Sequence, residues 1–323
     1  MSRVSRLATA AATVAALAVT ASGCVTVHGE REIVPTATEE EAAQALKDFT
    51  AAYNKADKAY DPALSAGRVS GPLGAINQAG LKAKQQNNPD GNPRHSPLKL
   101  TDAKFTIPKQ AGWPRWFVAD TQSNRGAQTR WFLVFTRGGP DQLWQASYLT
   151  ILATERVPEF KLDSDGWAEP IPANSTELAA APKDLSASYA TYLKDGSGAF
   201  APGKNTSEWR AARKKNASRP GLSTQWVDQP LTEDTFAPRG LRTKDGGAMV
   251  FFSTRHYEKR TAAEGVRLTV PPDLAALMTG EVKRSVTTEY TSNQAVKVPA
   301  KTVDGAGIVF LNRIQGTTGA KGA

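Results

Sequence analysis

The segment Arg130-Trp131-Phe132-Leu133-Val134-Phe135 carries the strongest strand signal in the chain. Bulky side chains alternate along it, which predicts that one of its faces is buried in a core. Apolar runs at Trp116–Ala119 and Trp144–Leu152 flank it, and the connections between them are short and rich in Gly, Asn and Asp. Loops of this length leave no room for helical crossovers, so the sequence predicts an antiparallel meander.

A long helix is expected before this meander. Thr38 is a favourable N-cap, and three acidic residues, Glu39–Glu41, follow it in the first turn. Leu46, Phe49 and Tyr53 then share one helical face. The first part of the chain is therefore expected to pack an N-terminal helix on an antiparallel sheet.

The same order of elements returns later in the chain. Leu185–Leu193 predicts a second amphipathic helix, Asn205–Glu208 caps another, and strand-like runs recur between Thr224 and Ile314. The sequence therefore predicts an α+β protein of two domains, each an N-terminal helix packed on a curved antiparallel sheet. The expected boundaries are a signal peptide at 1–23, a tether at 24–38, a first domain at 39–168, a linker at 169–184, a second domain at 185–314 and a flexible tail at 315–323.

This repeated order of elements resembles a tandem of nuclear-transport-factor-two-like or cystatin-like domains, in which a curved sheet wraps a long N-terminal helix. The resemblance rests on the order of helices and strands in the two halves and not on a shared residue motif. It implies a fold, and it names no activity and no ligand.

The N-terminal residues are typical of an export signal. Arg3 and Arg6 provide a positive start, and the apolar stretch at 7–21, about 15 residues, is too short to span a membrane. It ends in Ala21-Ser22-Gly23-Cys24, which contains the only cysteine of the chain. These residues predict that the protein is exported.

The order of these residues resembles the lipobox of bacterial lipoproteins, and the chain as a whole is similar to exported actinobacterial lipoproteins of this size. The resemblance implies that Cys24 is diacylated on sulfur and becomes the mature N-terminus on the outer face of the cytoplasmic membrane. The sequence departs from the family at Ala21, where Leu is commoner. The alternative is an ordinary secretory signal cleaved near Ala21 or Gly23, with Cys24 left as a free thiol.

Charge points to anionic partners. The net charge is +9, and removal of Arg3 and Arg6 with the signal leaves 9 − 2 = +7. We expect a membrane contact through the lipid on Cys24 and an envelope protein or an anionic polymer as further partner. Nucleic acid is not expected, because the protein is exported and its Lys and Arg are evenly scattered. The densest run, Arg210–Lys215, is interpreted as a solvated helix face.

No residue pattern predicts a catalytic, metal or cofactor site. The three histidines, His28, His95 and His256, are not paired at metal-ligand spacing. Ser96-Pro-Leu-Lys99 matches the Ser-x-x-Lys spacing of penicillin-recognising enzymes, but it leads into strand-like sequence, whereas that chemistry needs a helix N-terminus. We expect no cofactor.

One acidic loop looks at first like a calcium site. In an EF-hand alignment of Asp163-Ser-Asp-Gly166, the two anchoring positions are Lys161 and Pro172 and carry no carboxylate. A tight turn built from Asp and Gly is the expected structure.

Tryptophans gather in and around the first strand set, at Trp113, Trp116, Trp131 and Trp144. Core packing is the favoured interpretation for the group. Trp113 and Trp116, which bracket Pro114 before a strand, are the candidates for contact with a partner or ligand.

Two functions are left open by these observations. The favoured hypothesis is a lipid-anchored cell-envelope protein with a non-catalytic binding or interaction role. The alternative is a cell-envelope enzyme whose active site is assembled in a domain pocket from residues that lie far apart in the sequence.

Overall fold

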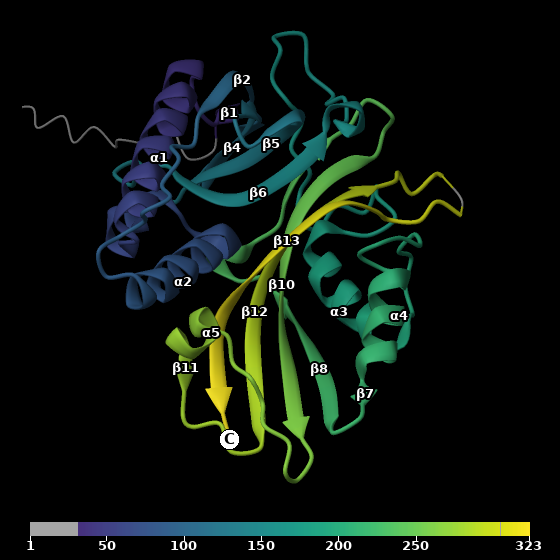
Figure 1. Ribbon diagram of the computed structural model, residues 1–323. Helices are drawn as coiled ribbons and strands as arrows, with labels where there is room; N and C mark the ends of the chain where they lie inside the picture. Colours follow the sequence, from purple (N-terminus) through teal and green to yellow (C-terminus); the bar gives the residue numbers. More distant parts are fainter. Residues whose placement is uncertain (1–31, 304) are drawn as a thin grey trace, which may run out of the picture.

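The structure is a computed structural model that describes residues 32–303 and 305–323 (Figure 1). The expected signal peptide at 1–23 and the lipidation site Cys24 lie outside the described residues. The helices are α1 (Glu39–Ala59), α2 (Gly71–Asn87), α3 (Leu185–Asp195), α4 (Ser207–Asn216) and α5 (Pro272–Ala276), with the short 3-10 helices η2 (Pro62–Leu64), η3 (Ala66–Arg68), η4 (Thr154–Arg156), η5 (Pro182–Asp184) and η6 (Asp234–Phe236).

The strands follow the same numbering in chain order. They are β1 (Val34–Pro35), β2 (Leu100–Thr106), β3 (Lys109–Gln110), β4 (Arg115–Ser123), β5 (Gly126–Arg137), β6 (Gln145–Ala153), β7 (Ser218–Arg219), β8 (Leu222–Leu231), β9 (Arg239–Arg242), β10 (Ala248–Ala262), β11 (Met278–Thr279), β12 (Ser285–Val298) and β13 (Val309–Gly322). In Figure 1, β1 lies at the opposite end of the molecule from the C-terminus.

The first sheet is antiparallel and runs in the order β2-β4-β5-β6, which confirms the predicted meander. Phe117 and Phe135 stack on its inner face with ring centroids 5.0 Å apart, and Phe49 of α1 packs edge-on against Phe135. Helix α1 starts where its residues predict, because Thr38 and Glu41 cap each other. The Glu41 amide donates to Thr38 Oγ1 at 3.1 Å, and the Thr38 amide donates to Glu41 Oε2 at 3.0 Å.

The second sheet is larger and runs in the order β11-β13-β12-β10-β8-β7, with β9 paired to the end of β10. Helix α3 covers one face of it. Leu185 and Tyr189 of α3 are fully buried against Phe252 of β10 and Val296 of β12. Each half of the chain thus places a helix on a mainly antiparallel sheet, with β11 parallel to β13 in the second, and the predicted α+β class is confirmed.

The two sheets share a core. Val118 and Phe132 of the first sheet lie in one buried cluster with Met249 and Phe251 of the second. The hydroxyl of Tyr148 crosses the junction and donates to the carbonyl of Phe236 at 2.8 Å. The domain boundaries at 39–168 and 185–314 stay predictions, since no gap in packing marks them.

The expected tether at 24–38 is wrong for its last residues. Val34–Pro35 forms β1 and pairs with Lys109–Gln110. Thr36 is completely buried, and its Oγ1 donates to the carbonyl of Trp116 at 2.6 Å. Backbone pairing and one buried hydroxyl order this segment without the apolar periodicity that sequence patterns detect.

The expected linker at 169–184 is also packed. Ile171 and Leu178 are buried, and the Ile171 amide donates to the carbonyl of Gly240 at 2.8 Å. Its prolines suggested an exposed boundary, but single apolar residues between them fill the side of the second sheet.

The expected flexible tail at 315–323 is wrong. These residues continue β13, which pairs with β12 through positions such as Thr291 opposite Gly316. The carbonyl of Ala323 accepts the amides of Lys283, Arg284 and Ser285. Glycine gives little strand signal, but the backbone hydrogen bonds to β12 do not depend on its side chain.

Within 32–303 and 305–323, no helix is both long enough and apolar enough to cross a membrane.

Candidate functional site

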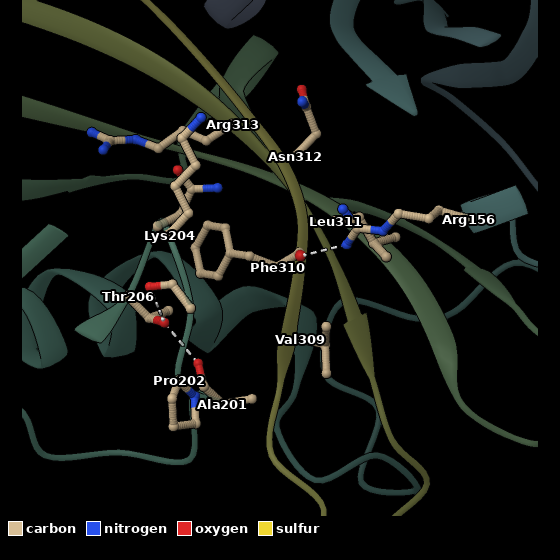
Figure 2. Close-up of a pocket in the computed structure, with 12 residues that line it drawn as sticks. Arg156, Ala201, Pro202, Lys204, Thr206, Val309, Phe310, Leu311, Asn312 and Arg313 are labelled. Atoms are coloured by element: carbon tan, nitrogen blue, oxygen red, sulfur yellow. Dashed lines mark hydrogen bonds between the residues drawn. The ribbon is translucent and has the colours of Figure 1, made fainter. Parts of the chain in front are cut away.

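A cavity of about 460 Å³ opens beside the first residues of β13 (Figure 2). Its volume falls in the usual range for ligand sites. Three segments line it: the C-terminal residue of η4, the loop that leads into α4, and the start of β13. The lining residues are Arg156, Ala201, Pro202, Gly203, Lys204, Asn205, Thr206, Val309, Phe310, Leu311, Asn312 and Arg313.

The charge of this pocket is one-sided. Arg156, Lys204 and Arg313 supply three cations, and none of the lining residues is Asp or Glu. Figure 2 shows Lys204 on one side of β13 and Arg156 on the other. The guanidinium of Arg156 donates from Nη2 to the carbonyl of Phe310 at 3.2 Å. A concave site whose charged side chains are all positive attracts anions.

Arg313 adds a positive charge that lies partly inside the protein. Its Nε and Nη2 atoms are shielded from solvent and have no hydrogen-bond partner among the described residues. The guanidinium lies over the ring of Trp209, 4.6 Å from the ring centroid. Burial lowers the pKa of Arg313, and the nearby Arg213 lowers it further.

The acidic residue that acts on Arg313 from nearby is Asp228, and it already forms an ion pair with Arg213. Both oxygens of Asp228 accept from Arg213, at 2.6 Å from Nη1 and 2.9 Å from Nη2, and both side chains are buried. Asp228 therefore neutralises Arg213 and leaves Arg313 without a bonded counter-ion. A partly buried guanidinium without an ion-pair partner can bind an incoming anion favourably.

His256 packs against Trp209, the ring that Arg313 also contacts. Its ring stacks on Tyr290 with centroids 4.6 Å apart and meets Trp209 edge-on at 6.5 Å. Burial lowers the pKa of His256 to about 2, and the charges of Arg313 and Arg213 act in the same direction. The imidazole is therefore neutral at physiological pH and adds no charge to the site.

The two tryptophans proposed for contact with a partner or ligand differ in exposure. Trp116 is only 3% exposed, and its Nε1 donates to Gln110 Oε1 at 2.9 Å. Its burial removes it as a candidate for surface contact, because alternation along β4 turns it into the cluster between the sheets. Trp113 is half-buried and lies against the guanidinium groups of Arg115 and Arg137.

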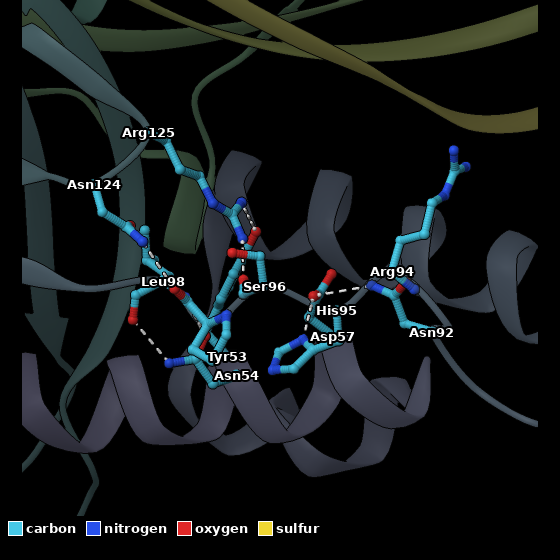
Figure 3. A network of polar contacts seen from close by, with 11 residues as sticks. Tyr53, Asn54, Asp57, Asn92, Arg94, His95, Ser96, Leu98, Asn124 and Arg125 are labelled. Atoms are coloured by element: carbon cyan, nitrogen blue, oxygen red, sulfur yellow. Dashed lines mark hydrogen bonds and ion pairs between the residues drawn. The ribbon is translucent and has the colours of Figure 1, made fainter.

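His95 belongs to a polar network that holds the loop after α2 against α1 (Figure 3). Its Nδ1 lies 2.8 Å from Asp57 Oδ2, and the same oxygen accepts Asn92 Nδ2 at 3.1 Å. Asn54 bonds both backbone groups of Leu98, at 2.7 and 2.9 Å. Every one of these bonds joins the loop to α1, so the network orders the backbone.

The two short motifs have structural roles. Ser96 and Lys99 lie in the irregular segment before β2, away from any helix N-terminus. Asp163 Oδ1 accepts the amides of Asp165 and Trp167, which makes the expected tight turn. No cluster of His, Cys, Asp and Glu suitable for a metal ion occurs within 32–303 and 305–323.

The basic pocket was not predicted from the sequence. Arg156 follows a strand of the first sheet, Lys204 precedes α4 and Arg313 lies on β13. No two of them are close enough in sequence to form a motif. The net positive charge of the chain was the only available signal, and it gave no position.

Comparisons with known proteins place the chain among lipoproteins. A model of the family described as "Domain of unknown function (DUF8094)" matches residues 33–322. An uncharacterized lipoprotein of Streptomyces coelicolor is 56% identical over 321 residues, which cover 99% of this chain and 96% of the relative. An uncharacterized lipoprotein of Streptomyces avermitilis is 58% identical over 317 residues, which cover 98% and 95%.

A second uncharacterized lipoprotein of Streptomyces coelicolor is 29% identical over 210 residues, 62% of this chain and 59% of the relative. These relatives confirm the expected similarity to actinobacterial lipoproteins. No solved structure shows a significant match to the chain. The resemblance to nuclear-transport-factor-two-like or cystatin-like domains therefore stays a prediction.

Proposed function

The chain belongs to the DUF8094 family, and we propose that it is a lipid-anchored cell-envelope protein whose basic pocket binds an anionic envelope ligand. The observation that carries the binding role is a cavity with three cationic and no acidic side chains. The net charge of the chain supports it through long-range attraction of anions.

The anchor is proposed to be a lipid on Cys24, after removal of residues 1–23. The order Ala21-Ser22-Gly23-Cys24 and the lipoprotein names of the relatives support it. Palmitate on the sulfur and attachment to the outer face of the cytoplasmic membrane follow from this proposal. Residues 24–33 reach at most about 35 Å when fully extended, so β1 would lie within that distance of the membrane.

Anchoring is tested by cell fractionation of Cys24→Ala. We expect the variant to leave the membrane fraction and to keep its cooperative thermal unfolding, because Cys24 precedes every described element. Retention of a folded Cys24→Ala in the membrane fraction would contradict lipid anchoring as the main attachment.

Ligand binding is tested by calorimetric titration of purified Cys24→Ala protein with short-chain polyphosphate and with poly-glutamate. We expect at least one of these two polyanions to bind, with affinity that falls as salt rises. Arg156→Glu/Lys204→Glu should abolish the binding.

The matched control is Lys283→Glu/Arg284→Glu, which makes the same change in net charge at two exposed positions directly before β12. Equal loss in both double variants would show that binding depends on net charge and not on the pocket. Absence of binding by either polyanion to the unaltered pocket would contradict the proposed function.

A further inference from the structure

An interrupted strand pairing lies inside the basic pocket. Segment 199–201 begins to pair in parallel with β13 at its outer edge, the edge that faces away from β12. The Ile308 amide donates to the carbonyl of Ala199 at 2.6 Å, and the Ala201 amide donates to the carbonyl of Ile308 at 2.9 Å. A parallel ladder that continued would next use the carbonyl of Ala201 and the amide of Gly203, both bonded to Phe310.

Both of those groups are engaged elsewhere. The carbonyl of Ala201 accepts Thr206 Oγ1 at 2.7 Å, a bond drawn in Figure 2. The amide of Gly203 donates to Ser207 Oγ at 3.1 Å. The loop before α4 is thereby turned away from β13, and its pairing ends at Ile308.

The outer edge of β13 stays unpaired beyond this point. On that edge, β11 reaches β13 only at its far end, where Met278–Thr279 pairs with Ala320–Lys321. No other strand among the described residues pairs with this edge between Val309 and Gly319. Within residues 32–303 and 305–323, the hydrogen-bond donor that meets the carbonyl of Phe310 is the exposed side chain of Arg156. Unpaired edges of this kind bind extended peptides by adding a strand.

We propose that an extended acidic segment of an envelope protein binds along Val309–Arg313 as an added strand. Its backbone would pair with the amide and carbonyl of Phe310, and its carboxylates would meet Lys204 on one side of β13 and Arg156 on the other. This deepens the proposed function, on which it rests, by naming the chemistry of the ligand.

The strand edge is the reason to favour a peptide over a phosphate polymer or a lipid head group. All three ligands carry the negative charge that the cations require. Only a peptide offers alternating N–H and C=O groups at the spacing of a strand. The charge at Lys204 and Arg156, with no acidic residue in the lining, selects an acidic peptide.

The test uses a fluorescent synthetic peptide, called here the Glu-Val peptide, in which Glu-Glu pairs alternate with Val-Val pairs. As a strand it carries carboxylates on both faces, and it is titrated into purified Cys24→Ala protein. Two matched peptides separate the contributions of backbone and charge. One carries N-methyl groups on alternate backbone nitrogens, and the other replaces every Glu with Lys. We expect the N-methylated peptide to bind at least about tenfold more weakly, because it lacks donors for strand pairing. The Lys peptide should not bind.

Amide hydrogen exchange of segment 309–313 gives a second readout. The Glu-Val peptide should slow exchange there, and polyphosphate should not, because it provides no acceptor in register with the strand. Equal affinity of the N-methylated and unmodified peptides, or unchanged exchange at saturation, would overturn strand addition. Polyphosphate binding would then still support the proposed function.

The protein side is tested with Arg156→Ser/Lys204→Ser. We expect at least about a tenfold loss of affinity for the Glu-Val peptide, since each cation near an acidic partner contributes several-fold. Charged side chains at strand edges can also serve only to prevent aggregation. Unchanged peptide affinity together with new aggregation of this variant would assign Arg156 and Lys204 to that role and overturn the proposal.

Discussion

Two arginines on strands, one in each sheet, show how the same residue type reaches opposite states. Arg130 of β5 donates from Nε to Asp120 at 2.6 Å and from Nη1 to Asp102 at 2.5 Å. Arg313 of β13 has its Nε and Nη2 shielded from solvent, with no such partner in the part of the chain that the structure describes. The first guanidinium is neutralised within the fold, whereas the second leaves a positive charge beside a pocket.

Arg213 stands between these two cases and sharpens the comparison. Its guanidinium lies over the ring of Trp209, as that of Arg313 does, but Asp228 neutralises it with two hydrogen bonds. A carboxylate could therefore be accommodated under α4, and the fold supplies one for only one of the two arginines. The comparison teaches that missing partners, more than the arginine itself, distinguish a ligand site from a structural ion pair.

The largest effect is expected from Arg130→Met. Asp120 is partly buried, and burial already raises its pKa even though Arg130 lowers it through a hydrogen bond. Removal of the arginine leaves this carboxyl without its cation, which should cost about 4 kcal/mol of unfolding free energy. Urea denaturation measures it. A loss below about 1 kcal/mol would mean that water replaces Arg130 at no cost.

The second-largest loss of unfolding free energy is expected from Asp228→Asn. It leaves Arg213 buried without its anion and should cost about 3 kcal/mol, because a guanidinium cannot lose its proton to escape the penalty. The substitution leaves Arg213, like Arg313, without a bonded carboxylate among the described residues. We therefore expect added polyphosphate to raise the melting temperature of Asp228→Asn more than that of the unaltered protein. An equal shift of the melting temperature in both proteins would show that the charge of Arg213 does not contribute to anion binding in the pocket.

A pH effect of about 2 kcal/mol is expected from His256. An unfolded histidine has a pKa near 6.5, and the folded pKa is depressed to about 2. Between these two values only the unfolded chain binds the extra proton, so stability falls as pH falls below about 6.5. From pH 7.5 to pH 5 the contribution is about 2 kcal/mol. His256→Gln should flatten that part of the pH profile, and an unchanged profile would contradict a neutral buried imidazole.

The smallest change in stability is expected from Arg313→Met. Loss of packing on Trp209 is offset by removal of a buried charge, so the unfolding free energy should change by less than about 1 kcal/mol. Polyanion affinity should fall about tenfold, measured by calorimetry. A large destabilisation without loss of binding would give Arg313 the same structural role as Arg130 and end the contrast between them.

Several elements could be predicted because their signals are local. The mutual cap of Thr38 and Glu41 spans one helical turn, and the apolar stripe that buries Phe49 follows from helical spacing alone. The meander around Trp131 is equally local, since alternation and short turns act between neighbours in sequence. These patterns specify the class of the fold and most of its first sheet.

Other elements carried no local signal. The second part of β13 contains Gly316, Gly319 and Gly322, and residues 315–323 were expected to be a tail, but pairing with β12 orders them. Trp116 was a candidate for contact with a partner although core packing was the favoured interpretation, because its side of β4 becomes interior only when the second sheet packs on the first. For Trp116 the deciding partner lies in the other sheet, more than a hundred residues away. For β13 the partner β12 directly precedes it in the chain, but its glycines leave no apolar alternation for a periodic pattern to detect.

By itself, the sequence determined the α+β class and the helix that opens the first half, because each depends on residues close together in the chain. It also predicts an export signal that ends at Cys24. Only the tertiary structure decided which charges are paired. Arg156, Lys204 and Arg313 become one basic pocket when η4, the loop before α4 and β13 meet. Neutralisation of an arginine depends on the distance to a carboxylate in space, and that distance exists only in the folded protein.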